Sequence, residues 1–257
     1  MSLKIWGIVM KTNKLLSAIK KAPFPTIMAI ISFILFLVVY SFVTVKAIKP
    51  YYLMGLIFII PFVSFGIIAY FTARAEIVPV ISYIITILLI VVSVLIMFVT
   101  FTFISIDAAT TETTDIEMYE RVLKLKDYPE NTLINYFPEK IPNNAENIAF
   151  RYNPAFVQGG ENFQLKFKTD SNSINKYIKE FSQEAKWTGK VNDSETENNG
   201  VFIASFHALG YDKLPDDFTI YLIGSKPYRS MDWNHGELSL VAISKFRNEI
   251  IFVAEDW

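Results

Sequence analysis

The chain has 257 residues, of which 52% are hydrophobic and 19% charged, and its mean hydropathy is positive. Soluble domains carry about 25% charged residues, so this composition indicates that part of the chain lies in a membrane. Residues 1–106 contain eight basic residues and one acid, whereas residues 107–257 contain sixteen basic and twenty-four acidic residues. The acidic part argues against nucleic-acid binding, which requires a basic face. The absence of cysteine excludes disulfides, thiolate nucleophiles and Cys-based metal sites.

The first segment, residues 1–22, is basic and amphipathic. On a helical wheel four of its lysines fall within about a third of the circumference, and apolar residues lie elsewhere. Such a helix can lie in the headgroup region with its lysines toward anionic lipid. The alternative is an unstructured basic tail that only sets orientation. The residues expected at the membrane surface are Lys4, Lys11, Lys14, Lys21 and Trp6.

Three apolar stretches follow, at residues 26–48, 51–73 and 77–106. Each is long enough for a transmembrane helix, because a hydrocarbon core about 30 Å thick needs about 20 apolar residues. Pro23 and Pro25 are expected to separate the basic segment from the first span, and Pro61 is expected to kink the second. The interiors of the spans carry no charged side chain, which argues against an ion or proton path through this chain alone.

Basic residues in the flanking segments set the expected orientation. Five lysines precede the first span, and Arg74 lies in the second loop. On the other side, Lys46 and Lys49 lie in the first loop, and Arg121 follows the third span. Six basic residues against three place the N-terminus in the cytoplasm and the C-terminal part outside.

Residues 107–257 predict an α+β extracytoplasmic domain with a mainly antiparallel sheet and one or two covering helices. A helix is expected from Asp170 or Ser171 to about Lys186, because apolar residues recur there at helical spacing. Strands are expected where apolar and polar residues alternate. The expected strands are residues 147–152, 162–168, 201–209, 218–223, 237–244 and 249–254.

The start of this domain is polar. Residues 107–114 are expected to form a tether after the third span. Thr114 with Glu117 three residues later matches a capping box, which predicts a short helix to about Lys126.

Prolines punctuate the stretch from Tyr128 to Lys168 in the pattern YP, FP, IP, YNP and QGG. This pattern resembles a family of exported Gram-positive bacterial domains, which are often anchored by lipid or by helices. The resemblance covers about residues 107–257 and implies a location on the outer side of a bacterial cell membrane. No chemical motif lies within it, so it implies no site residue.

The best candidate for chemistry is the segment DWNHGE. Asp232, His235 and Glu237 are metal-ligand types within six residues. The competing interpretation, which the sequence favours, is a turn before a strand, with Gly236 allowing the bend.

Two other groups of residues are weaker candidates. His207 lies beside Ser205 and Phe206 in an expected strand, but no Gly-x-Ser-x-Gly elbow accompanies it. Asp193, Glu195 and Glu197 alternate in a polar loop and can offer oxygens to calcium, but the EF-hand spacing and its glycine are absent.

The sequence therefore predicts a multi-pass membrane protein that displays a non-catalytic binding or sensing domain without catalytic residue, metal or cofactor. The expected partners are the lipid bilayer and an envelope protein or cell-wall ligand, with no nucleic acid. The alternative is an accessory subunit of a transport or export complex, in which the spans pack against other membrane proteins.

Overall fold

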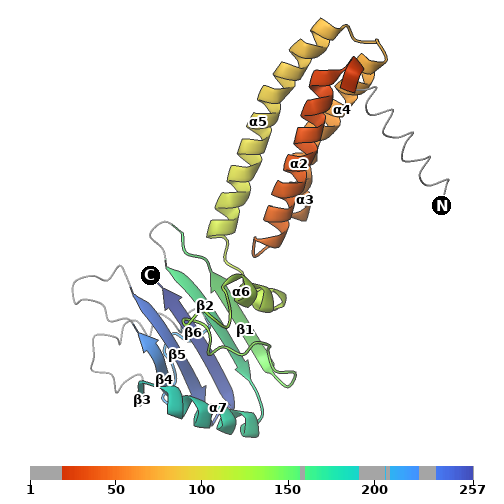
Figure 1. Cartoon of the computed structure of the whole chain (residues 1–257). Coiled ribbons are helices and arrows are strands. Elements are labelled where there is room, and N and C mark those ends of the chain that lie inside the picture. Colours follow the sequence, from red (N-terminus) through yellow and green to blue (C-terminus); the bar gives the residue numbers. More distant parts are fainter. Residues whose placement is uncertain (1–18, 157–159, 191–205, 207–208, 226–235, 257) are drawn as a thin grey trace, which may run out of the picture. The chain divides into compact units, whose positions relative to one another are not determined.

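The computed structural model divides the chain into two compact units. We call Met1–Ala108 the helical unit and Ala109–Trp257 the sheet unit, and each is described by itself (Figure 1). The described residues are 19–156, 160–190, 206, 209–225 and 236–256.

Within its described residues, the helical unit contains three helical runs that are long and apolar enough to cross a membrane, judged by length and composition. Residues 19–21 are helical, the chain bends at Ala22, and α2 begins at Pro23. Proline is tolerated in a first turn because its missing N–H would have no helical partner there. The runs are α2 (Pro23–Val45), the segment formed by α3 (Tyr52–Gly55), η1 (Leu56–Ile59) and α4 (Ile60–Ala73), and α5 (Pro79–Thr110).

The second run is irregular just before Pro61. A proline N atom cannot donate to the carbonyl four residues earlier. The chain tightens into the 3-10 segment η1, and regular α-helix resumes at Ile60. The predicted disturbance at Pro61 therefore takes the form of a 3-10 turn.

Small polar side chains hold the helical unit together at one end. Ser82 and Thr86 on α5 are fully buried, and the Thr72 hydroxyl of α4 donates to Ser82 Oγ over 2.8 Å. Small side chains let helix backbones approach closely, and such hydrogen bonds join helices in apolar surroundings. At the other end of α5, the Tyr51 hydroxyl donates to Asp107 Oδ2 over 2.6 Å.

The sheet unit is built on one six-stranded antiparallel sheet in the order β1-β2-β6-β5-β4-β3, which confirms the predicted α+β layout (Figure 1). The strands are β1 (Glu146–Asn153), β2 (Glu161–Lys168), β3 (Trp187–Gly189), β4 (Phe218–Ser225), β5 (Glu237–Ser244) and β6 (Glu249–Asp256). The described part of this unit includes the helices η2 (Ile116–Met118), α6 (Tyr119–Leu125) and α7 (Ser171–Glu184).

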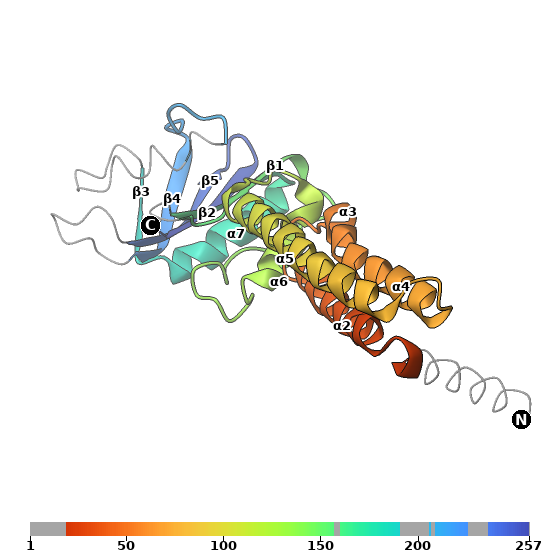
Figure 2. The ribbon, with the colours of Figure 1, turned by 90° about the horizontal axis from the view of Figure 1, so that it is seen from above.

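Both faces of this sheet are covered. On the face where α7 lies (Figure 2), the Phe252 ring contacts Phe181 of α7 and Phe137, with ring centroids 5.9 and 5.4 Å apart. On the opposite face, Ile251 and Val253 of β6 pack in one cluster with Phe206, Leu209 and Leu214. Successive side chains of a strand point to opposite faces, so a sheet covered on both sides buries every side chain of its central strands. This explains why β5 and β6 are buried almost throughout.

The predicted strand at residues 201–209 is wrong where the structure describes it. Phe206 is helical, and the N–H of Leu209 donates to the Phe206 carbonyl over 3.0 Å in the turn that follows. Residues 201–205 and 207–208 lie outside the described residues. Phe206 and Leu209 are apolar because they cover the sheet, and covering a face does not require an extended backbone.

Local details near residue 110 also differ from the predictions. Helix α5 continues to Thr110, so the first residues of the expected tether are helical. The cap of η2 is Asp115, whose Oδ1 accepts the N–H of Glu117 over 3.0 Å. The predicted capping box at Thr114 is therefore wrong, because the adjacent carboxylate takes that position. The short strand β3 was not predicted, since three residues carry no detectable alternation.

Candidate functional site

Strand β1 is an edge strand whose outer side is only partly paired. Thr113 forms an isolated antiparallel bridge with Tyr152, with its N–H donating to the Tyr152 carbonyl over 2.9 Å and the return bond measuring 2.8 Å. The backbone N–H and C=O of Tyr152 therefore point away from β2.

The backbone N–H and C=O of Phe150 also point away from β2. Tyr152 and Phe150 stand opposite Phe163 and Leu165 of β2, and in an antiparallel pair every second residue directs its N–H and C=O away from the partner strand. Among the described residues, none forms a backbone hydrogen bond with Phe150 on this outer side. The chain that pairs with Tyr152 leaves the edge at Asp115, where it turns into η2. One ladder position of β1 is thus left open.

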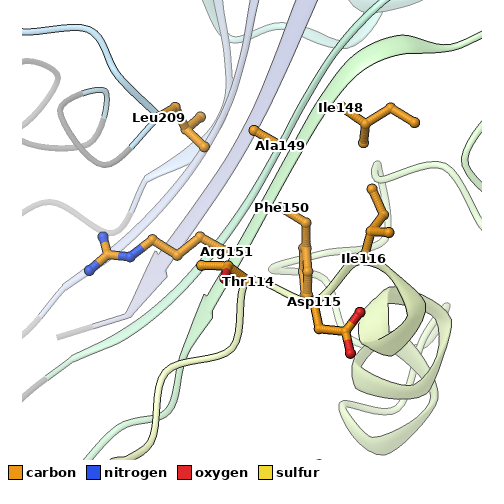
Figure 3. Close-up of a pocket in the computed structure, with 8 residues that line it drawn as sticks. All are labelled: Thr114, Asp115, Ile116, Ile148, Ala149, Phe150, Arg151 and Leu209. Carbon is orange, nitrogen blue, oxygen red and sulfur yellow. The ribbon is translucent and has the colours of Figure 1, made fainter.

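The open position lies in a groove of about 580 Å³ (Figure 3). Ile116 and Ile148 lie on one side of β1, where they are 37% and 38% exposed, and Leu209 lies on the other. The Phe150 ring is buried on the same face of the sheet as Phe163, and it packs edge-on against Tyr119, with ring centroids 5.6 Å apart. The groove is lined by Thr114, Asp115, Ile116, Ile148, Ala149, Phe150, Arg151 and Leu209.

The charged groups at this groove are already engaged. Arg151 forms a bidentate ion pair with Glu112, in which Nε and Nη2 each lie 2.8 Å from a carboxylate oxygen of Glu112. This contact raises the pKa of the Arg151 guanidinium. The Asp115 carboxylate caps η2. What the groove offers a ligand is therefore one outward-pointing backbone pair between apolar walls, and no acid–base pair.

The groove has a defined end. Asn147 has a positive φ of 50°, and the pairing of β1 with β2 shifts between Glu146 and Ala149. Such a bulge twists an edge strand away from further pairing. The available edge is thus limited to Ile148–Phe150, which suits a short extended segment.

Glu237 is the described member of the predicted site in the DWNHGE segment. It is the first residue of β5, is half-buried, and lines a small polar cavity of about 320 Å³ with Lys186, Thr132 and Asn135. The described residues contain no cluster of three or more metal-ligand side chains. Lys21, the described member of the predicted membrane surface, is exposed. The other candidates lie outside the described residues: Lys4, Trp6, Lys11, Lys14, Asp193, Glu195, Glu197, Ser205, His207, Asp232 and His235.

Sequence reasoning missed the groove. The alternation in NIAFRY predicted the strand, but nothing in that stretch indicates that it lies at the edge of the sheet. The edge position of β1 depends on the strand order. The open ladder position at Phe150 depends on where a distant segment, Thr113–Asp115, leaves β1.

The fold and the groove define an antiparallel α+β unit with an open strand edge, in a chain with three long apolar helices. Comparison with protein-family models, with curated proteins and with solved structures finds no match.

Proposed function

We propose that the chain is a multi-pass protein of a bacterial cell membrane, with its N-terminus in the cytoplasm and its sheet unit outside. Three apolar helical runs support insertion, and many of their apolar side chains are exposed, such as Val80 at 67% and Phe98 at 68%. Lipid is a favourable environment for such side chains. The excess of basic residues before the first span and in the second loop supports the orientation.

Reporter fusions test this topology. Alkaline phosphatase fused after Trp257 should be active in bacterial cells, and green fluorescent protein fused there should be dark. An inactive phosphatase with a bright fluorescent fusion would reverse the orientation.

We propose further that the sheet unit acts by binding an extended polypeptide segment of an envelope protein along the edge of β1. The observation that carries this proposal is the outward-directed N–H and C=O of Phe150, beside the point where the segment paired with Tyr152 turns away. A strand added to a sheet edge gains backbone hydrogen bonds, and pockets for alternate side chains give specificity. Ile116 and Ile148 would receive one set of side chains, and Leu209 would receive the other.

The engaged charges support a binding role. Arg151 and Asp115 stabilise the protein's own structure, so the groove recognises shape and backbone without a reactive group. The function is thus capture of a short extended segment by a membrane-anchored domain.

The test uses the full chain in lipid nanodiscs and a random twelve-residue peptide library. Selected peptides should contain alternating apolar residues and should bind the unmodified chain. The double variant I116K/I148K should lose at least about tenfold in affinity, because each change puts a charge against the apolar wall. Both side chains are partly exposed, so the fold should survive.

The matched control is F246K, which places the same charge at an exposed apolar side chain in the β5–β6 turn. It should bind peptides as the unmodified chain does. A second measurement follows hydrogen exchange of the segment Glu146–Asn153, where bound peptide should slow exchange because the Phe150 N–H becomes paired. If selected peptides bind I116K/I148K normally and leave this exchange unchanged, the groove is not the binding site.

A further inference from the structure

A second cavity, of about 650 Å³, lies in the helical unit where α4 turns into α5. Its wall contains the turn residues Arg74, Ile77 and Val78 together with Lys21, which lies two residues before α2. Two cationic side chains from distant parts of the sequence thus line one cavity at one end of the helices.

The positive charges at this cavity are only partly neutralised. Lys21 forms no ion pair or hydrogen bond with any described residue. Arg74 uses Nε for Glu76, at 3.1 Å, and Nη1 for the Tyr70 hydroxyl, at 2.6 Å. Its Nη2 makes no hydrogen bond with the described part of the chain. Glu76 is the one acid in the first 106 residues, so the cavity keeps a net positive charge.

The first turn of α5, which follows the cavity-lining residue Pro79, has free backbone donors. The first helical hydrogen bond there runs from the Ser82 N–H to the Val78 carbonyl, so the N–H groups of Val80 and Ile81 have no helical partner. These donors reinforce the positive potential of the two side chains.

The other wall is apolar. Ile77, Val78 and Pro79 continue directly into the exposed apolar surface of α5, and Val78 is 59% exposed. A ligand that matches both walls has a phosphate next to a hydrocarbon chain.

We propose that this cavity binds the headgroup phosphate of an anionic phospholipid. Lys21 and the free Nη2 of Arg74 pair with the phosphate, while the acyl chains lie along the apolar start of α5. A lipid bound here ties the α4–α5 turn to the start of α2.

The test is native mass spectrometry of the full chain in detergent with added dioleoylphosphatidylglycerol or dioleoylphosphatidylcholine. The unmodified chain should retain phosphatidylglycerol in preference to phosphatidylcholine. The double variant K21Q/R74Q should weaken retention about thirty-fold, since each cation near a lipid phosphate contributes about a fivefold factor. The single variant K21Q, at an exposed side chain that forms no ion pair or hydrogen bond with the described residues, should weaken it about fivefold.

The matched control is K46Q/K49Q, which removes two positive charges at the other end of α2. It should change retention by less than about threefold. Equal losses in the two double variants would overturn the proposal, because they would show that only total charge matters. It would also fail if phosphatidylcholine bound equally well, or if the water-soluble headgroup glycerophosphoglycerol displaced the lipid at equal concentration.

Discussion

Replacement of Phe252 by alanine should severely destabilise the sheet unit. Phe252 is fully buried at the centre of β6. The centroid of its ring lies within 6.1 Å of the ring centroids of Phe137, Phe167, Tyr177 and Phe181. It therefore joins the sheet to α7 and to the loop that contains Phe137. Removing a buried phenyl ring loses its transfer free energy and leaves a cavity, at a total cost of about 4 kcal/mol.

Urea unfolding of the full chain in detergent measures this loss, with tryptophan fluorescence as the signal. Three of the four tryptophans, Trp187, Trp233 and Trp257, belong to the sheet unit. With a urea dependence of about 2 kcal/mol per molar, the midpoint of F252A should fall by about 2 M.

The control is F246A, because Phe246 is 86% exposed in the β5–β6 turn. Its free energy of unfolding should stay within about 0.5 kcal/mol of the unmodified chain. If F252A costs no more than F246A, the aromatic cluster does not form the core of this face, and the placement of α7 against the sheet is refuted.

Two further predictions concern polar contacts in the sheet unit. The Tyr211 hydroxyl donates to Glu249 Oε1 over 2.5 Å, and Glu249 is 4% exposed. Y211F leaves this buried acceptor unpaired and should lower the free energy of unfolding in urea by about 1–3 kcal/mol, whereas E249Q keeps an acceptor oxygen and should cost less. Equal stability of Y211F and the unmodified chain would contradict this prediction. The Asp170 carboxylate accepts hydrogen bonds from the Ser173 hydroxyl and from the N–H groups of Ser173 and Asn172, and these bonds lower the pKa of Asp170 below its usual 3.8. The charged form of Asp170 therefore stabilises the fold above pH 3.8, and this contribution is lost as the pH falls through the folded-state pKa. The melting temperature of the unmodified chain should therefore exceed that of D170N at pH 6, and the difference should shrink below about pH 4; a difference that grows on acidification would show that the charge of Asp170 is not stabilising.

A partly buried network beside β6 could not be predicted from the sequence. Lys166, Tyr211 and Glu249 are ordinary polar residues in the sequence, yet the Lys166 Nζ lies 4.9 Å from the centroid of the Tyr211 ring and donates to the Leu209 carbonyl over 2.5 Å. Together they attach the segment around Leu209 to the sheet. No local pattern predicts such contacts, because the contacting residues are at least 38 positions apart in the sequence.

Local patterns were sufficient for several elements. Three apolar runs specify long helices, because each residue's preference for an apolar environment adds along a contiguous stretch. The alternation in β1 and β2 predicted strands, and the helical spacing of Ile174, Tyr177 and Phe181 predicted α7 within two residues of its end. These elements are determined by neighbours in the sequence.

Other features were decided only when distant segments met. The order β1-β2-β6-β5-β4-β3 makes β1 an edge strand. Because the chain turns away from β1 at Asp115, the outward N–H and C=O of Phe150 stay unpaired among the described residues. Phe206 and Leu209, which were expected in a strand, instead cover one face of the sheet. The periodicity of apolar residues indicates which side of an element is buried, but not which other segment covers it. The buried sides of the elements were therefore predictable from the sequence, whereas the groove at β1 is defined only in the assembled sheet.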